Sequence, residues 1–216
     1  YHDQHMGRLI EKLRSWGLME DTLLIITNDH GEELDDHGKM GHGHSLYDEL
    51  VRAPLLIRLP GRVPAGQVLS EPVESVDIAP TVLQMLGMNS SQAHEGVSLV
   101  SLMEGRPAQR PFYAVTEFLK AGRSVRVGTW KMIGTSSRWK KLYNVAEDPG
   151  EQNNLIEDAP LARRMCELYM TEALANPNKR FRQLKARTGR TFKSEDVEMD
   201  PELKKQLEAL GYFHED

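Results

Sequence analysis

Histidines and carboxylates gather in one short stretch of this 216-residue sequence. Asp29 and His30 stand side by side, three residues after the apolar run 23–26. With the glycine-rich loop that follows, four histidines fall within fifteen residues: His30, His37, His42 and His44. A neighbouring carboxylate and imidazole can both bind one divalent cation. The pattern therefore predicts a metal site that includes Asp29 and His30.

The same residues also have simpler interpretations. Asp29 could cap a turn while His30 points to solvent, and the later histidines could form a metal cluster, an anion pocket or only a polar loop. Imidazole suits zinc and related ions, whereas oxygen ligands suit calcium, so one Asp and one His leave the metal open. Lys39 could bind an oxyanion or be a solvated loop residue. Arg52 precedes an apolar run and could pair with a neighbouring acid.

The elements around this stretch indicate an α/β domain. Apolar residues at helical spacing predict a helix over residues 1–16. The continuous apolar run 23–26 is typical of a parallel strand covered on both faces, and ligands bind beyond the carboxyl ends of such strands. A second strand is predicted over residues 53–59. The pattern of residues 75–86 predicts a helix that begins near Pro80.

After residue 111 the pattern changes. Four short alternating segments, broken by glycines, predict a small antiparallel sheet. A helix is predicted over residues 159–175. The basic run 179–193 could attract an anionic surface or be a solvated extended segment.

Composition argues against several classes of protein. The formal net charge of −5 does not favour a nucleic-acid partner, which calls for a basic surface. No apolar run approaches the ~20 residues that a membrane span needs. The single cysteine, Cys166, allows no disulfide within the chain, and its apolar neighbours predict a core position.

Longer motifs follow one another in a fixed order along the chain. They are Asn28-Asp29-His30-Gly31-Glu32-Glu33-Leu34, His37-Gly38, His42-Gly43, Leu46-Tyr47-Asp48-Glu49, Arg52-Ala53-Pro54-Leu55-Leu56-Ile57, Val76-Asp77-Ile78-Ala79-Pro80-Thr81, Leu142-Tyr143-Asn144 and Asp148-Pro149. This ordered series resembles the sulfatase family of the alkaline phosphatase superfamily.

The resemblance implies an α/β fold, with an alkaline-phosphatase-like mixed sheet flanked by helices and a small carboxy-terminal antiparallel sheet carrying a helix. It implies that Asp29 and His30 bind a divalent cation, usually Ca²⁺ in sulfatases and Mn²⁺ or Zn²⁺ in related phospho- and phosphonohydrolases. It implies that His42 contacts the transferred group, and an imidazole there could steady sulfate oxygens or protonate a leaving oxygen. The remaining candidates are expected at most to support the loop or to contact these three residues: His37, His44, Lys39 and Arg52.

The sequence also departs from the family pattern. The family's nucleophile lies in a Cys/Ser-x-Pro-x-Arg stretch, which is absent here, as are the amino-terminal acidic ligands. We therefore expect a carboxy-terminal portion of a longer hydrolase that is inactive alone. Asp35 stands where the family usually has glycine. The expected division is the second half of the catalytic domain (1–110), a small sheet subdomain with a helix (111–178), and a basic tail with a terminal helix (179–216).

Three hypotheses follow. The first is a metal-dependent sulfatase acting on a small-molecule or glycan sulfate ester. The second keeps the fold but makes the substrate a phosphodiester or a phosphonate monoester. The third is a non-catalytic, metal-stabilised binding domain.

Overall fold

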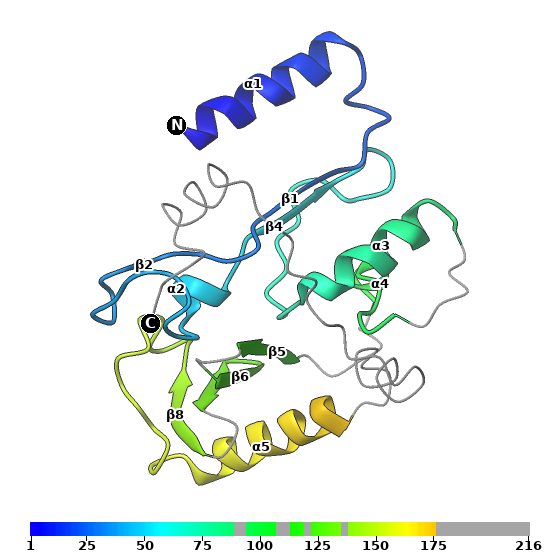
Figure 1. Cartoon of the computed structure of the whole chain (residues 1–216). Coiled ribbons are helices and arrows are strands. Elements are labelled where there is room, and N and C mark those ends of the chain that lie inside the picture. Colours follow the sequence, from blue (N-terminus) through cyan, green and yellow to red (C-terminus); the bar gives the residue numbers. More distant parts are fainter. Residues whose placement is uncertain (89–93, 107–112, 119–121, 135–137, 176–216) are drawn as a thin grey trace, which may run out of the picture. The chain divides into compact units, whose positions relative to one another are not determined.

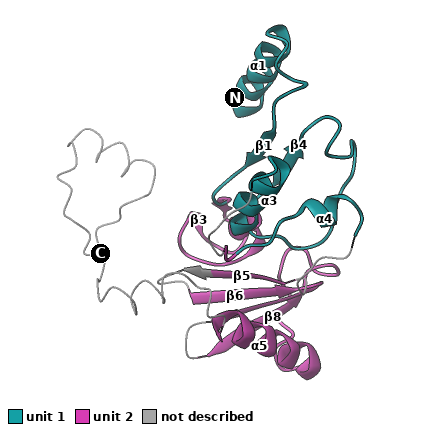
Figure 2. Ribbon diagram, turned by 90° about the vertical axis from the view of Figure 1, so that its right-hand side faces the viewer, with its two compact units in different colours: residues 1–30, 53–92, 96–112 teal, residues 31–52, 93–95, 113–216 magenta. Residues whose placement is uncertain are grey.

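The computed structural model describes residues 1–88, 94–106, 113–118, 122–134 and 138–175. The chain divides into two compact units (Figure 2). The first unit comprises residues 1–30, 53–92 and 96–112, and the second comprises residues 31–52, 93–95 and 113–216. Residues 31–52 thus belong to the second unit although both flanking segments belong to the first. The linear division expected from the sequence does not anticipate this interleaving, and its tail, 179–216, lies outside the described residues.

The first unit begins with helix α1 (His2–Ser15), which confirms the predicted amino-terminal helix (Figure 1). Gly17 follows it with a φ of 69°, a left-handed conformation that glycine adopts without steric cost. No residue of α1 is buried, and Leu9 of its apolar stripe is 48% exposed. Helical periodicity therefore predicts the helix correctly but says nothing of what covers it.

Strand β1 (Leu24–Thr27) pairs with β4 (Leu55–Arg58) in antiparallel orientation. The prediction of a parallel strand is wrong for this pair, because residues 28–54 return the chain beside β1 without the crossover that parallel pairing requires. In β4, Leu55 and Ile57 pack on the core of the first unit, whereas Leu56 is 55% exposed. Successive side chains point to opposite faces, so among the described residues β4 is covered on one face. The apolar residues of β1 are all partly buried.

The core of the first unit lies between this strand pair and two helices. The 3₁₀ turn η1 (Ser75–Asp77) leads into α3 (Ile78–Met85), so Pro80 lies in the first helical turn. There its missing N–H leaves no helical hydrogen bond unmade, and the helix begins two residues before the predicted start. Helix α4 (Val100–Met103) follows. The buried members of this core are Met85, Leu99 and Met103.

Buried Asp77 ties the loops of this core together. Its carboxylate accepts hydrogen bonds from the N–H groups of Glu74 and Val97, both at 2.9 Å. The Thr81 hydroxyl donates to the Asp77 carbonyl at 2.6 Å and accepts from the Leu99 N–H at 2.9 Å. Each of these buried polar groups is therefore satisfied internally, which gives the motif at residues 76–81 a structural role.

The second unit is built on a four-stranded antiparallel sheet, in agreement with the prediction. Its strands in spatial order are β5 (Tyr113–Phe118), β6 (Gly122–Val127), β7 (Trp130–Gly134) and β8 (Trp139–Asn144). Helix α5 (Pro160–Ala175) packs along one face (Figure 1). Cys166 is fully buried in that interface, as expected, and burial raises the pKa of its thiol to about 12.

Residues 31–52 add a short hairpin and one helical turn to this unit. The hairpin consists of β2 (Glu33–Leu34) and β3 (Met40–Gly41), and the helical turn is α2 (Asp48–Val51). Among the described residues, no helix combines the length and the apolar composition needed to cross a bilayer.

Candidate active site

Asp29 and His30 lie just beyond the carboxyl end of β1, where the sequence predicts a site. The His30 N–H donates to Asp29 Oδ1 at 3.0 Å, a local bond that orients the carboxylate. His30 Nε2 lies 3.8 Å from Asp29 Oδ2. The Asp29 side chain is 77% exposed and that of His30 31%. An accessible carboxylate thus stands beside a half-buried imidazole.

The hairpin of the second unit determines the position of His42. Glu33 is paired with Gly41, so the next residues outward, Glu32 and His42, also lie opposite each other. His42 Nδ1 is 3.3 Å from Glu32 Oε1. The His42 side chain is only 18% exposed, whereas that of Glu32 is 48% exposed. The hairpin therefore gives His42 a carboxylate partner that the spacing of histidines does not reveal.

A second carboxylate of the hairpin supports His44. His44 Nδ1 is 3.1 Å from Glu33 Oε2, and Glu33 is 1% exposed. An ionised carboxylate is costly to bury unless it is paired. This contact fits the supporting role suggested for His44.

The turn of the hairpin depends on unusual backbone conformations. Asp35 has a φ of 77° and Gly38 a φ of 74°. The Asp35 N–H donates to the Lys39 carbonyl at 2.8 Å, and the Gly38 N–H donates to the Asp35 carbonyl at 3.2 Å. Left-handed conformations favour glycine and, among other residues, Asn and Asp. This explains why the position of Asp35 suits glycine and still accepts aspartate.

Gly31 fixes the start of the hairpin against α2. Its N–H donates to the Leu50 carbonyl at 2.7 Å, and the N–H of Glu32 donates to the Glu49 carbonyl at 3.1 Å. A Cβ on Gly31 would lie 2.0 Å from the Glu49 carbonyl oxygen. Only glycine fits this close approach of two backbone segments.

His37 is fully engaged within the second unit. Its Nδ1 lies 2.6 Å from Glu49 Oε1, and its Nε2 lies 3.3 Å from the Glu151 carbonyl. Its ring stacks on Tyr47 at 3.5 Å with an interplanar angle of 2°. Both ring nitrogens and the ring face of His37 therefore have protein partners, which fits the supporting role suggested for it.

Lys39 and Arg52 are both exposed. Among the described residues, Arg52 forms no ion pair with Asp48 or Glu49, so the expected pairing with a neighbouring acid is not found. Arg52 instead lines a cavity of about 380 Å³ together with His37 and other polar residues of the second unit.

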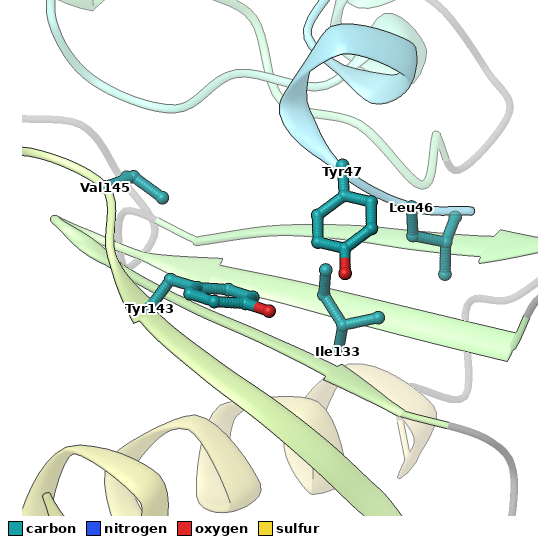
Figure 3. Packing of buried hydrophobic residues seen from close by; sticks show 5 residues of the cluster. All are labelled: Leu46, Tyr47, Ile133, Tyr143 and Val145. Atoms are coloured by element: carbon teal, nitrogen blue, oxygen red, sulfur yellow. The ribbon is translucent and has the colours of Figure 1, made fainter. Parts of the chain in front are cut away.

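The loop of residues 31–52 is attached to the sheet by an apolar cluster (Figure 3). Leu46 and Tyr47 of the loop face Ile133, Tyr143 and Val145. The Tyr47 hydroxyl also accepts a hydrogen bond from the Lys141 ammonium. Burial, reinforced by the Tyr47 hydroxyl, raises the pKa of Tyr143 well above its ordinary value, so this phenol stays neutral.

A buried ionic network makes a second attachment. Lys131 Nζ lies 2.6 Å from Asp48 Oδ1 and 3.0 Å from Glu151 Oε1. Glu151 Oε2 accepts the Asp48 N–H at 2.6 Å, and Arg126 lies 3.1 Å from Asp48 Oδ2. Lys131 and Glu151 are 1% and 2% exposed. Burial raises the pKa of Glu151, and the Lys131 ammonium opposes that rise.

Sequence reasoning missed Lys131 altogether. Glu151 continues the ordered motif series two residues after Asp148-Pro149, but the series does not indicate its burial or its partner. Both residues contact Asp48 and so hold the loop that carries His42.

Comparison with known proteins identifies the family. Residues 1–88 match the family model described as Sulfatase. An N-acetylglucosamine-6-O-sulfatase of Bacteroides thetaiotaomicron is 30% identical over 180 residues, covering 77% of this chain and 32% of that protein. The chain belongs to the sulfatase family. It spans about a third of the length of the curated relatives it matches.

Two further relatives of this sulfatase chain come from elsewhere in the superfamily. The multifunctional alkaline phosphatase superfamily protein PehA of Trinickia caryophylli is 40% identical over 111 residues, 49% of this chain and 21% of that protein. The structure of the Silicibacter pomeroyi phosphonate monoester hydrolase matches with a TM-score of 0.69 and 27% identity, covering 82% of this chain and 39% of that one. These matches confirm the expected fold class.

The donor atoms of Asp29 and His30 fit a divalent cation. Ligand atoms 2.0–2.6 Å from one ion lie roughly 3–4 Å apart when they are adjacent in its coordination sphere. The 3.8 Å between Asp29 Oδ2 and His30 Nε2 falls in this range. The Asp29 carboxylate is a ligand type suited to calcium or manganese, and the His30 imidazole is one suited to zinc.

Proposed function

We propose that the protein containing this sulfatase chain hydrolyses sulfate esters. The observation that carries the proposal is the carboxylate–imidazole pair of Asp29 and His30, 3.8 Å apart beyond β1, in a chain whose first 88 residues match the sulfatase family. A glycan sulfate ester is the favoured substrate, since a similar curated protein is an N-acetylglucosamine-6-O-sulfatase.

Asp29 and His30 would hold part of a divalent-cation site, for which we propose Ca²⁺. When bound, such a cation polarises ester oxygens and offsets developing negative charge. The sequence has no Cys/Ser-x-Pro-x-Arg stretch. The proposed reaction therefore takes its nucleophile from residues outside this sequence. The nucleophile attacks sulfur, and the ester oxygen leaves with the electron pair of the broken S–O bond.

His42 would protonate the leaving group. As imidazolium, it would donate a proton to the departing oxygen, and the neighbouring Glu32 carboxylate at 3.3 Å would orient its ring. Its largely buried side chain limits competition from water. This need for a proton is greatest for alkyl or sugar leaving groups, which are more basic than a nitrophenolate.

The test uses the longer protein that carries the nucleophile. Asp29→Ala should lower sulfate release from 4-nitrophenyl sulfate at least about 100-fold, because loss of a metal ligand removes several kcal/mol of stabilisation. Asp21→Ala, an exposed aspartate before β1, is the matched control and should keep full activity. Near-normal turnover by Asp29→Ala would remove Asp29 from the site.

His42→Ala separates the proton donor from the metal site. It should lower kcat by about 10²–10⁴-fold with a sugar sulfate, and much less with 4-nitrophenyl sulfate. Metal content should be unchanged. An equal loss with both substrates would refute the proposed protonation of the leaving group.

A phosphonate or phosphodiester hydrolase is the second candidate, favoured by the 40% identity to PehA and the match to a phosphonate monoester hydrolase. Turnover of 4-nitrophenyl sulfate and 4-nitrophenyl phenylphosphonate by the same preparation distinguishes the two. A higher kcat/KM for the phosphonate, with bound manganese or zinc, would favour this candidate. No turnover of either ester, together with metal-dependent stabilisation, would favour a non-catalytic domain.

A further inference from the structure

The second unit has a groove between α5 and the start of β8. No residue of the hairpin lines it. Its volume is about 490 Å³, within the usual ~300–1,000 Å³ of ligand pockets. The residues that matter for its chemistry are Arg123, Arg138, Trp139, Arg163, Arg164 and Glu167.

The charge of this groove is opposite to that of the chain. Four arginines line it with two glutamates, Glu157 and Glu167, whereas the whole chain has a net charge of −5. Every cation in the lining is an arginine. A guanidinium presents five N–H donors in a planar fork and binds tetrahedral oxyanions through two parallel hydrogen bonds. The lining therefore favours a ligand with several oxyanion groups.

Glu167 pairs with two of the arginines beside the groove. Arg163 Nε lies 3.0 Å from Glu167 Oε1, and Arg164 lies 3.5 Å from Glu167 Oε2. The Arg163 and Arg164 side chains are still 41% and 69% exposed, so a ligand can reach them. Because a shared carboxylate restrains both side chains, less entropy is lost when they bind an anion.

Trp139 gives the groove an apolar wall. Its ring packs partly against the buried cluster beneath α5 and also lines the groove. A flat ring beside charged donors suits a sugar ring that carries anionic substituents, because the two parts of the ligand meet matching surfaces.

We propose that this groove binds a sulfated oligosaccharide, with the arginines contacting sulfate groups and Trp139 contacting a sugar ring. The proposal concerns binding without turnover and does not depend on the proposed hydrolytic function.

The test is calorimetric titration of the full chain with sulfated maltohexaose, unmodified maltohexaose and a thymidine hexanucleotide. Salt of about 0.15 M limits long-range attraction to a Debye length of ~8 Å. Only the sulfated sugar should bind well. Arg123→Gln/Arg138→Gln should weaken this binding about tenfold or more. Arg8→Gln/Arg14→Gln, which removes the same charge from exposed positions of α1, should change it less than about twofold.

A variant that binds the sulfated sugar more tightly serves as a control for loss of folding. Glu157→Gln removes a carboxylate from the groove and should tighten binding several-fold, which damage to the fold cannot produce. Equal weakening by the two double substitutions would overturn the proposal. So would equal binding of unmodified maltohexaose, tighter binding of the hexanucleotide, or unchanged binding by Glu157→Gln.

Discussion

Lys131→Met is the most informative perturbation of the scaffold beneath the hairpin. Lys131 is 1% exposed and contacts two carboxylates, those of Asp48 and Glu151. Methionine has a similar length and keeps the apolar contacts of the stem. The substitution therefore removes the charge alone and leaves two acids without their ammonium partner.

The loss of stability expected for Lys131→Met depends on the hydrogen bonds and ion pairs that Asp48 and Glu151 keep. Removing one partner of a buried ion pair typically costs about 3–5 kcal/mol. Asp48 keeps Arg126 at 3.1 Å, and Glu151 keeps the Asp48 N–H at 2.6 Å, so we expect the lower end, about 3 kcal/mol. This should lower the urea midpoint of unfolding by roughly 1–1.5 M.

The loss of stability caused by Lys131→Met should depend on pH. Burial raises the pKa of Glu151, and Lys131 is the main group that opposes this rise. Without Lys131 the folded-state pKa rises further. A carboxyl whose folded pKa lies above its unfolded value near ~4.3 favours folding below that value, and this contribution is lost as pH rises through the folded pKa. The deficit of Lys131→Met should thus be largest at pH ~7.5 and shrink toward pH ~5.

Urea unfolding followed by far-UV circular dichroism at both pH values measures the effect. Lys140→Met, on an exposed lysine of β8, is the control and should change the free energy of unfolding by less than about 0.5 kcal/mol. Adding Glu151→Gln to Lys131→Met should recover at least about 1 kcal/mol at pH ~7.5, because no ionised Glu151 remains buried. A loss under about 1 kcal/mol, or a loss independent of pH, would refute the reasoning.

Three further predictions concern backbone and core. Gly31→Ala should lower stability by about 2 kcal/mol or more, since its Cβ would lie 2.0 Å from the Glu49 carbonyl. Gly7→Ala, with open space around it in α1, should instead raise the free energy of unfolding by about 0.5–1 kcal/mol. Thermal melts of the two variants measure both effects. Asp35→Gly should be more stable than Asp35→Ala by about 1 kcal/mol in urea, because only glycine adopts a φ of 77° without strain; equal stabilities would contradict this. Cys166, the single cysteine, should not react with Ellman's reagent at pH ~8 in the folded chain, because burial and a pKa of about 12 leave roughly 10⁻⁴ of it as thiolate. One equivalent should react in denaturant, and rapid reaction of the native chain would show that α5 opens.

Local pattern was sufficient for the regular elements. The apolar stripe predicted helix α1, and the alternation of apolar residues predicted strands β5 to β8. Both predictions succeeded because the period of apolar side chains shows which face of an element is apolar. The same reasoning placed Cys166 in the core. It failed for the pairing of β1 with β4, because a continuous apolar run carries no information on the direction of the neighbouring strand.

Charged side chains were the hardest to interpret from sequence. A lysine or glutamate in a sequence is expected on the surface, yet Lys131 and Glu151 are buried because each neutralises the other. The Asp48 partner of Lys131 lies 83 residues away in the chain. No local pattern can indicate a contact at that separation.

The sequence by itself determined the family, the candidate ligands Asp29 and His30, and the candidate His42, since residue type and order are enough to specify donor atoms. Only the tertiary structure decided which carboxylate faces which histidine, and that the loop of residues 31–52 folds with the carboxy-terminal sheet. The reason is physical: backbone pairing sets the register that brings Glu32 to His42, and burial makes the attachments of that loop strong.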